Sequence, residues 1–156
     1  MPAMPARTTI ERISAITALI IFVYFILVQL LVIIGAVPVS ILWGGSHDEL
    51  TWQLRLASLF GALILAGFAY VIYKRTEHVL KGDRSYDGEV RSSTPSNANR
   101  ILSWMVTAYL ALNTVGNFAS KTVYERYMSG TLALVLTVAC AIISSSDVQQ
   151  DEYEQL

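Results

Sequence analysis

The sequence predicts an all-α membrane protein in which four transmembrane helices form one antiparallel bundle, with both chain ends in the cytosol. Three observations predict this fold. The 156 residues are 54% hydrophobic and only 15% charged, whereas a soluble domain carries about 25% charged residues. The apolar residues gather in four runs of helical length. Lys and Arg concentrate in the segments that this topology assigns to the cytosolic side.

Four apolar runs set the limits of the predicted spans. A transmembrane helix rises about 1.5 Å per residue, so it needs roughly 20 apolar residues to cross a hydrocarbon layer about 30 Å thick. The first run is longer than the apolar segment of a cleaved signal peptide, about 7–15 residues, which indicates a retained span. The spans, which form a single membrane domain over residues 1–156, are 13–37, 54–74, 101–119 and 124–144.

Local start and stop signals support these limits. A Ser or Thr followed three residues later by Glu can bond the free backbone N–H groups at a helix start. This pattern precedes three of the four runs, at Thr8–Glu11, Ser46–Glu49 and Thr122–Glu125. We expect Pro38 to end or kink the first helix. We expect Gly82 to end the second helix after Lys81.

Basic residues predict the orientation of the helices, because cytosolic loops carry an excess of Lys and Arg. Two basic residues precede the first span and six lie from the last residue of the second span to the third. The other side has only Arg55, near the start of the second span, and Lys121 and Arg126, around the start of the fourth. Both termini and the middle loop are therefore expected in the cytosol, with the plasma membrane as the expected location. The middle loop, residues 76–99, ends in a stretch rich in Ser and Asn that predicts flexibility.

Four polar side chains fall at a similar depth in the predicted outer half of the bundle, namely Gln29, Arg55, Asn113 and Asn117. Polar groups in a span either form hydrogen bonds between helices or line a pocket or pore for a ligand. In the first interpretation, Arg55 extends its charge to the lipid headgroups. In the second, all four side chains line a vestibule. We favour the first interpretation, because amide side chains often link helices within a membrane bundle.

The central part of the spans contains no Asp, Glu, Lys or His. Proton-coupled exporters and intramembrane acid–base enzymes need such groups at depth, so both classes are disfavoured. Cys140 is the single cysteine, and His47 and His78 have no second ligand at metal-binding spacing, so we expect no disulfide and no metal site. No cofactor is expected. A net charge of −1 gives no indication of a nucleic-acid partner.

Small residues mark candidate helix-packing positions, because they let two helix backbones approach closely. In the second and third spans these residues are Ala57, Gly61, Ala62, Ala66 and Gly116. They serve either packing within the bundle or contact with a second copy or a partner membrane protein. The chain also ends in Tyr153-Glu-Gln-Leu156, which matches the Tyr-x-x-apolar sorting signal that clathrin adaptors read on the cytosolic side.

Two stretches resemble recurring elements of small, uncharacterised four-helix integral membrane proteins. One is LNTVGNFASKTVYER at 112–126, and the other is PVSILWGG at 38–45, ahead of the second helix. The resemblance implies the fold and the length, and it brings no activity with it. It also implies that Asn113, Gly116 and Asn117 end the third helix and stabilise a hairpin.

For function, three classes follow from these observations. We favour a non-enzymatic membrane protein that acts through helix–helix association, as an assembly, sorting or regulatory subunit. The alternative is a passive pore or carrier for a small neutral or anionic solute. An intramembrane enzyme is the least favoured class, because no acid, base or nucleophile is placed at depth.

Overall fold

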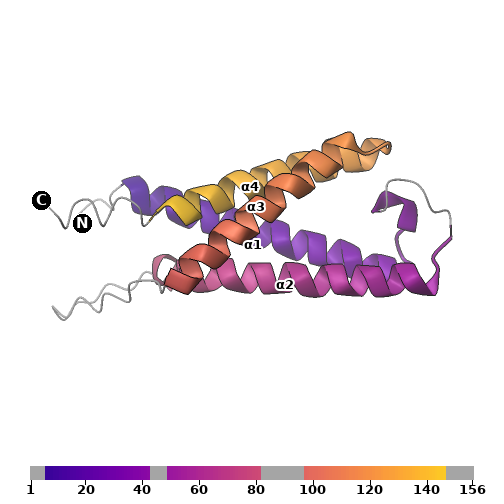
Figure 1. The fold of residues 1–156 in the computed structure, drawn as a ribbon, viewed down its shortest axis with the longest axis horizontal. Coiled ribbons are helices and arrows are strands. Elements are labelled where there is room, and N and C mark those ends of the chain that lie inside the picture. The colour runs from indigo at the N-terminus through magenta and orange to yellow at the C-terminus, as the bar shows by residue number, and fades with distance from the viewer. Residues whose placement is uncertain (1–5, 43–48, 82–96, 147–156) are drawn as a thin grey trace, which may run out of the picture.

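The computed structural model describes residues 6–42, 49–81 and 97–146, and all of their regular structure is helical. Figure 1 shows four long helices and two short elements. In chain order they are α1 (Ala6–Ile33), the 3₁₀ turn η1 (Val39–Ile41), α2 (Trp52–Lys81), α3 (Asn97–Ala119), the π-helix η2 (Tyr124–Ser129) and α4 (Gly130–Ser145). The prediction of an all-α fold with four helices is confirmed.

The helices are arranged as two closely packed pairs. α1 packs along α2 and α3 packs along α4, while the pairs meet mainly through α1 and α4. Figure 1 shows the start of α1, the end of α2, the start of α3 and the end of α4 at one end of the molecule. Toward the opposite end, which carries η1 and η2, the two pairs diverge.

Three helical stretches are long and apolar enough to cross a membrane, namely Thr9–Ile33, Trp52–Glu77 and Tyr124–Ser145. Their outward faces carry large apolar side chains such as Ile20, Phe60 and Tyr127, each more than 60% exposed. Soluble monomers rarely expose continuous apolar surface of this kind, whereas lipid is a good solvent for it. These features are those of a membrane protein.

The interior holds a mixture of apolar and hydroxyl side chains. Phe22, Ile72, Leu110 and Leu136 are fully buried where the four helices meet. Ser and Thr hydroxyls, which need a partner where no water is available, mostly bond a carbonyl one turn earlier in the same helix; Thr76, for example, donates to Ile72 O at 2.8 Å. The interior therefore combines an apolar core with hydroxyl groups that form hydrogen bonds, while large apolar side chains also cover the outer surface.

α1 ends earlier than the sequence predicted, and Gly35 ends it. Gly35 has φ +78°, a left-handed conformation that favours glycine. Its N–H donates to Val32 O at 3.0 Å, and the Ala36 N–H donates to Leu31 O at 2.9 Å. Together these bonds form the Schellman motif that closes a helix. The predicted span 13–37 is therefore too long by a turn, and Pro38 lies beyond the end of the helix.

Of the three predicted start signals, one is confirmed and one is wrong. The Glu125 N–H donates to Thr122 Oγ1 at 3.3 Å, as predicted. Thr8 lies inside α1, which already begins at Ala6, so Thr8 does not cap it. Ser46 lies outside the described residues. α2 begins at Trp52 instead, after Thr51 Oγ1, which accepts the Leu54 N–H at 3.4 Å.

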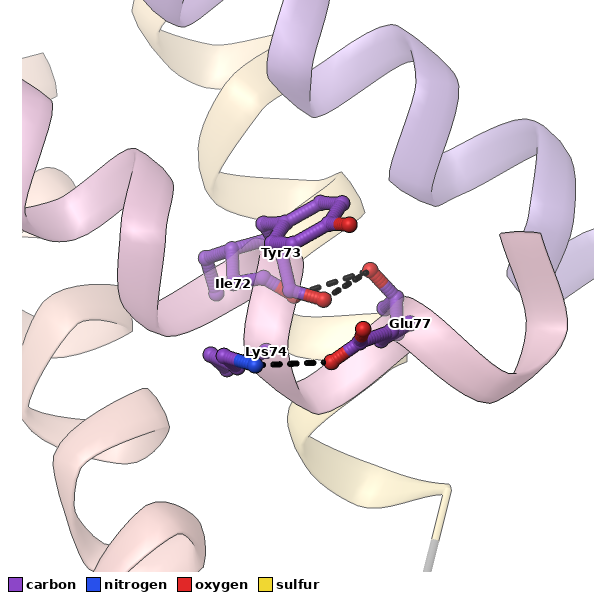
Figure 2. Close-up of polar contacts among 5 residues, drawn as sticks. Ile72, Tyr73, Lys74 and Glu77 are labelled. Carbon is purple, nitrogen blue, oxygen red and sulfur yellow. Dashed lines mark hydrogen bonds and ion pairs between the residues drawn. The ribbon is translucent and has the colours of Figure 1, made fainter. Parts of the chain in front are cut away.

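The middle loop is shorter than predicted. Residues 76–81 continue α2 and residues 97–99 begin α3, while residues 82–96 lie outside the described part of the chain. The end of α2 at Lys81 agrees with the predicted stop at Gly82. Figure 2 shows the last turns of α2, where the ammonium group of Lys74 lies 3.0 Å from the Glu77 carboxylate. This pair stabilises the helix where it leaves the apolar segment.

Candidate functional site

A partly open cavity of about 140 Å³ lies between the two helix pairs, in the half of the bundle that carries η1 and η2. Every helix contributes to its wall. The polar lining residues are Gln29, Tyr109, Asn113, Asn117, Glu125 and Ser129; the others are Phe25, Leu42, Gly61, Ile64, Leu65, Leu110, Ala133 and Leu136. Three of the four polar residues that the sequence grouped together therefore line one cavity.

Gln29 reaches the cavity from α1, beside a glycine of α2. A Cβ atom on Gly61 would lie 3.0 Å from Gln29 Nε2, so only the absence of a side chain at Gly61 leaves room for the amide. Gln29 Oε1 is buried and has no hydrogen-bond donor within the described residues. A buried carbonyl oxygen without a donor costs about 1–3 kcal/mol. The position therefore holds an acceptor that a bound molecule can satisfy.

Asn113 and Asn117 reach the cavity from one face of α3, four residues apart. Asn113 is exposed and Asn117 is half-buried. The side-chain amides of these residues make no hydrogen bond within the described part of the chain. The interpretation that they link helices is therefore wrong for this structure. The expectation that they end the third helix is also wrong, because α3 continues to Ala119.

Glu125 is the lining residue that the sequence-based prediction overlooked. Its residue surface is only 6% exposed, and its carboxylate accepts hydrogen bonds from the hydroxyls of Ser120 and Thr122, the second at 3.1 Å. The sequence assigned Glu125 only to a helix start, at the edge of the fourth span, and did not place it among the cavity residues. The signal in the sequence was the Thr122–Glu125 spacing, because the Thr122 hydroxyl bonds the Glu125 carboxylate and holds it over the helix start.

A π-helix positions Glu125 and Ser129 on the cavity wall. η2 spans Tyr124–Ser129, and the Gly130 N–H donates to Glu125 O, five residues earlier. A π turn has backbone bonds between residues five apart, where an α-helix has bonds between residues four apart. Single π turns inside helices are often found at functional sites. Sequence periodicity gives no sign of this turn.

Arg55 does not belong to the cavity. Its Nη1 donates to the carbonyl oxygen of Ile33 at 2.7 Å, so it caps the C-terminal end of α1 and stabilises the negative end of the helix dipole. Arg55 is absent from the described residues that line the cavity with the three amides, because equal depth in the membrane does not imply the same helix face. The alternative that all four side chains line one vestibule therefore has no support from this residue.

The hydrogen bonds that link the helices involve hydroxyl groups and a second arginine. Thr107 Oγ1 and Ser144 Oγ lie 3.2 Å apart, and Thr114 Oγ1 and Thr137 Oγ1, about two turns away, lie 3.1 Å apart. Arg75 is only 3% exposed and reaches from α2 to the end of α4, where it donates to Ile143 O at 3.0 Å and Ser144 O at 3.1 Å. The sequence treated Arg75 as part of the cytosolic flank.

The predicted packing residues divide into two groups. Ala62 is buried, and Ala57 and Gly61 are half-buried on α2, which packs along α1. Ala66 and Gly116 are exposed, and a Cβ on Gly116 would meet no atom within 4 Å. The prediction of close packing within the bundle is therefore wrong for Ala66 and Gly116.

Two predictions about sites remain, the sorting signal and the absence of a metal site. Tyr153 and Leu156, the candidate sorting signal, lie outside the described residues. Within the described ranges, no three His, Cys, Asp or Glu side chains lie close enough to hold a metal ion. Comparisons with models of protein families, with curated proteins and with solved structures found no match to this chain.

Proposed function

We propose that this chain is a non-enzymatic integral membrane protein that binds a small polar solute in its cavity, as a passive carrier or pore. The observation that carries the proposal is the buried Gln29 Oε1, an acceptor without a donor in the described chain, in a cavity that two further unbonded amides line. Packing alone gives no reason to keep the buried Gln29 oxygen unbonded in an apolar bundle, because such a group is costly there. A polar ligand supplies the missing bonds.

The proposal includes four antiparallel spans. Arg75 bonds the end of α2 to the end of α4, so these two helix ends lie on the same side of the bundle. If α2 and α4 both cross the membrane, the chain between them must cross once more. α3 has 23 residues, about 34 Å of helix, which is enough to cross. The distribution of basic residues then favours cytosolic termini and an outward-facing cavity, with the plasma membrane as the proposed location.

A reconstituted flux measurement tests the proposal. Liposomes that contain the full chain should take up small polar solutes faster than empty liposomes, and Asn113→Leu or Asn117→Leu should abolish the difference. Val115→Leu is the matched control, because this exposed residue lies on α3 outside the cavity lining. Absence of flux and of solute binding in the folded wild-type protein would overturn the proposal.

Association with another membrane protein is a second candidate function, and the exposed small residues favour it. Ala66 and Gly67 lie exposed on α2, and a Cβ on Gly67 would meet open space. Such a surface lets a second helix approach closely. Crosslinking in native membranes tests this candidate: Ala66→Leu and Gly67→Leu should remove a specific crosslinked species while solute binding persists. If both variants keep the species, this face is not the interface.

A further inference from the structure

The amide groups on the cavity wall indicate which class of solute the cavity accepts. Gln29, Asn113 and Asn117 each carry one amide, and none of these amides makes a hydrogen bond within the described residues. A side-chain amide has N–H donors and a carbonyl acceptor, so the wall offers both kinds of partner. A solute that only donates or only accepts hydrogen bonds leaves part of this capacity unused.

Gln29 sets the strongest requirement, because its amide is enclosed between α1 and α2. Its Oε1 is buried without a donor in the described chain, and its Nε2 occupies the space that Gly61 leaves, 3.0 Å from the position of a Cβ there. The terminal torsion of a Gln side chain has a broad range, so rotation can exchange the positions of Oε1 and Nε2. A solute with a donor beside an acceptor can bond whichever atom faces it, whereas a ketone lacks the donor that Oε1 needs.

The Glu125 carboxylate lies on the same wall but already has partners. It accepts hydrogen bonds from the hydroxyls of Ser120 and Thr122, and Glu125 makes a further interaction in the chain. A carboxylate with partners of its own does not call for a cationic solute. Moving an unpaired charge from water into apolar surroundings costs far more than moving a neutral amide, so we expect a neutral solute.

The apolar part of the wall and the volume of the cavity limit the body of the solute. Phe25, Leu65, Leu110 and Leu136 present apolar surface to the cavity, which a purely polar solute would leave unused. The volume of about 140 Å³ is close to the roughly 150 Å³ of a protein cavity that accommodates benzene, a molecule of about six non-hydrogen atoms. A carboxamide group on a short branched alkyl body has this size.

Resting on the proposed function, we infer that the cavity selects a small neutral carboxamide, in which an N–H donor and a carbonyl acceptor lie side by side on a short alkyl body. Four probes of nearly equal shape test the inference: isobutyramide, isopropyl methyl ketone, the anionic isobutyrate and the cationic isobutyramidinium. Each is titrated into the full chain in lipid nanodiscs and followed by NMR of the solute, with protein-free nanodiscs as the blank for partition into lipid. Isobutyramide should bind about tenfold tighter than the ketone, and both ions should bind more weakly than isobutyramide.

Two variants identify the residue responsible. Gln29→Met keeps the length of the side chain and removes a buried acceptor without a donor in the described chain, so the protein should still fold. The preference for isobutyramide over the ketone should fall from about tenfold to about threefold or less. Gln53→Met is the matched control, because Gln53 is exposed on α2 outside the cavity lining, and it should leave the preference unchanged. Equal affinity of the wild-type protein for the amide and the ketone would overturn the inference. So would an undiminished preference in folded Gln29→Met.

The outcomes keep the inference separate from the proposed function. If the ketone or either ion binds best, the cavity is a solute site of another class, and only the carboxamide inference fails. The same conclusion follows if none of the four probes binds while other polar solutes cross the reconstituted membrane. If no probe binds and no solute flux is found, the proposed function fails as well.

Discussion

The buried Arg75 gives the sharpest prediction about stability. Arg75→Met keeps most of the apolar side chain and removes its charge and its donors. The two hydrogen bonds to Ile143 O and Ser144 O are charge-assisted, and each such bond contributes about 1.5–3 kcal/mol. The freed carbonyls lie in the last turn of α4, and we take the lower end of the range for each bond. We predict a loss of about 3 kcal/mol in the free energy of unfolding.

The assay is reversible unfolding in mixed micelles with increasing SDS, followed by circular dichroism and tryptophan fluorescence. Lys74→Met is the matched control, because it removes the neighbouring positive charge, whose side chain lies outside the bundle in contact with Glu77 (Figure 2). The control should lower the free energy of unfolding far less than Arg75→Met does, because an ion pair on the exposed face of a single helix is weak. Equal shifts for Arg75→Met and Lys74→Met would refute the reasoning, because the effect would then depend on charge and not on the bonds between α2 and α4.

Three further substitutions test individual features of the fold. Gly35→Ala places a side chain at φ +78° and should destabilise the protein by about 1 kcal/mol in the same unfolding assay; an unchanged midpoint would contradict the Schellman ending of α1. Gly61→Ala brings a Cβ to 3.0 Å from Gln29 Nε2, so solute binding should weaken severalfold while stability changes by less than about 1.5 kcal/mol. Unchanged binding would mean that Gln29 does not form the wall. Thr114→Val and Thr137→Val, which remove a 3.1 Å hydroxyl contact, should show a coupling energy of about 0.6 kcal/mol in a double-mutant cycle; zero coupling would count against that bond.

The sequence predicted the helices well, because each of them is a local property. Apolar runs of sufficient length and the stop at Gly82 depend on neighbours in the chain, and the structure agrees with them at α2 and at the end of α3. The end of α1 was harder to predict. Pro38 and Gly35 both carry stop signals, and only the backbone conformation shows that the glycine acts first.

The candidate site was predicted in part, for a related reason. Depth along a helix can be read from the sequence, so Gln29, Asn113 and Asn117 were grouped correctly. The direction in which a side chain faces depends on how helices pack against one another. Arg55 therefore turned out to face the end of α1. Glu125 entered the cavity through a π turn that leaves no periodic pattern in the sequence.

Arg75 illustrates the same limit for the packing of the bundle. Next to Lys74, it reads as one of two cytosolic flanking charges. Adjacent residues in a helix point about 100° apart, so Lys74 faces outward and Arg75 faces α4. Only the placement of α4 against α2 distinguishes the two residues.

The central claim is that a solute-binding cavity opens toward the outer side of the membrane, and thiol accessibility tests it directly. The single cysteine, Cys140, is fully buried. A Cys140→Ala background removes its thiol, so that each test variant carries one thiol only. Asn117→Cys then places one thiol on the cavity wall, and Ser145→Cys places one at the exposed end of α4. A membrane-impermeant cationic methanethiosulfonate reagent is added to intact cells or to their inverted membranes.

We predict that Asn117→Cys reacts from outside the cell and that Ser145→Cys reacts only in inverted membranes. Reaction of Asn117→Cys from the cytosolic side alone, or no reaction from either side in folded protein, would contradict an outward-facing cavity.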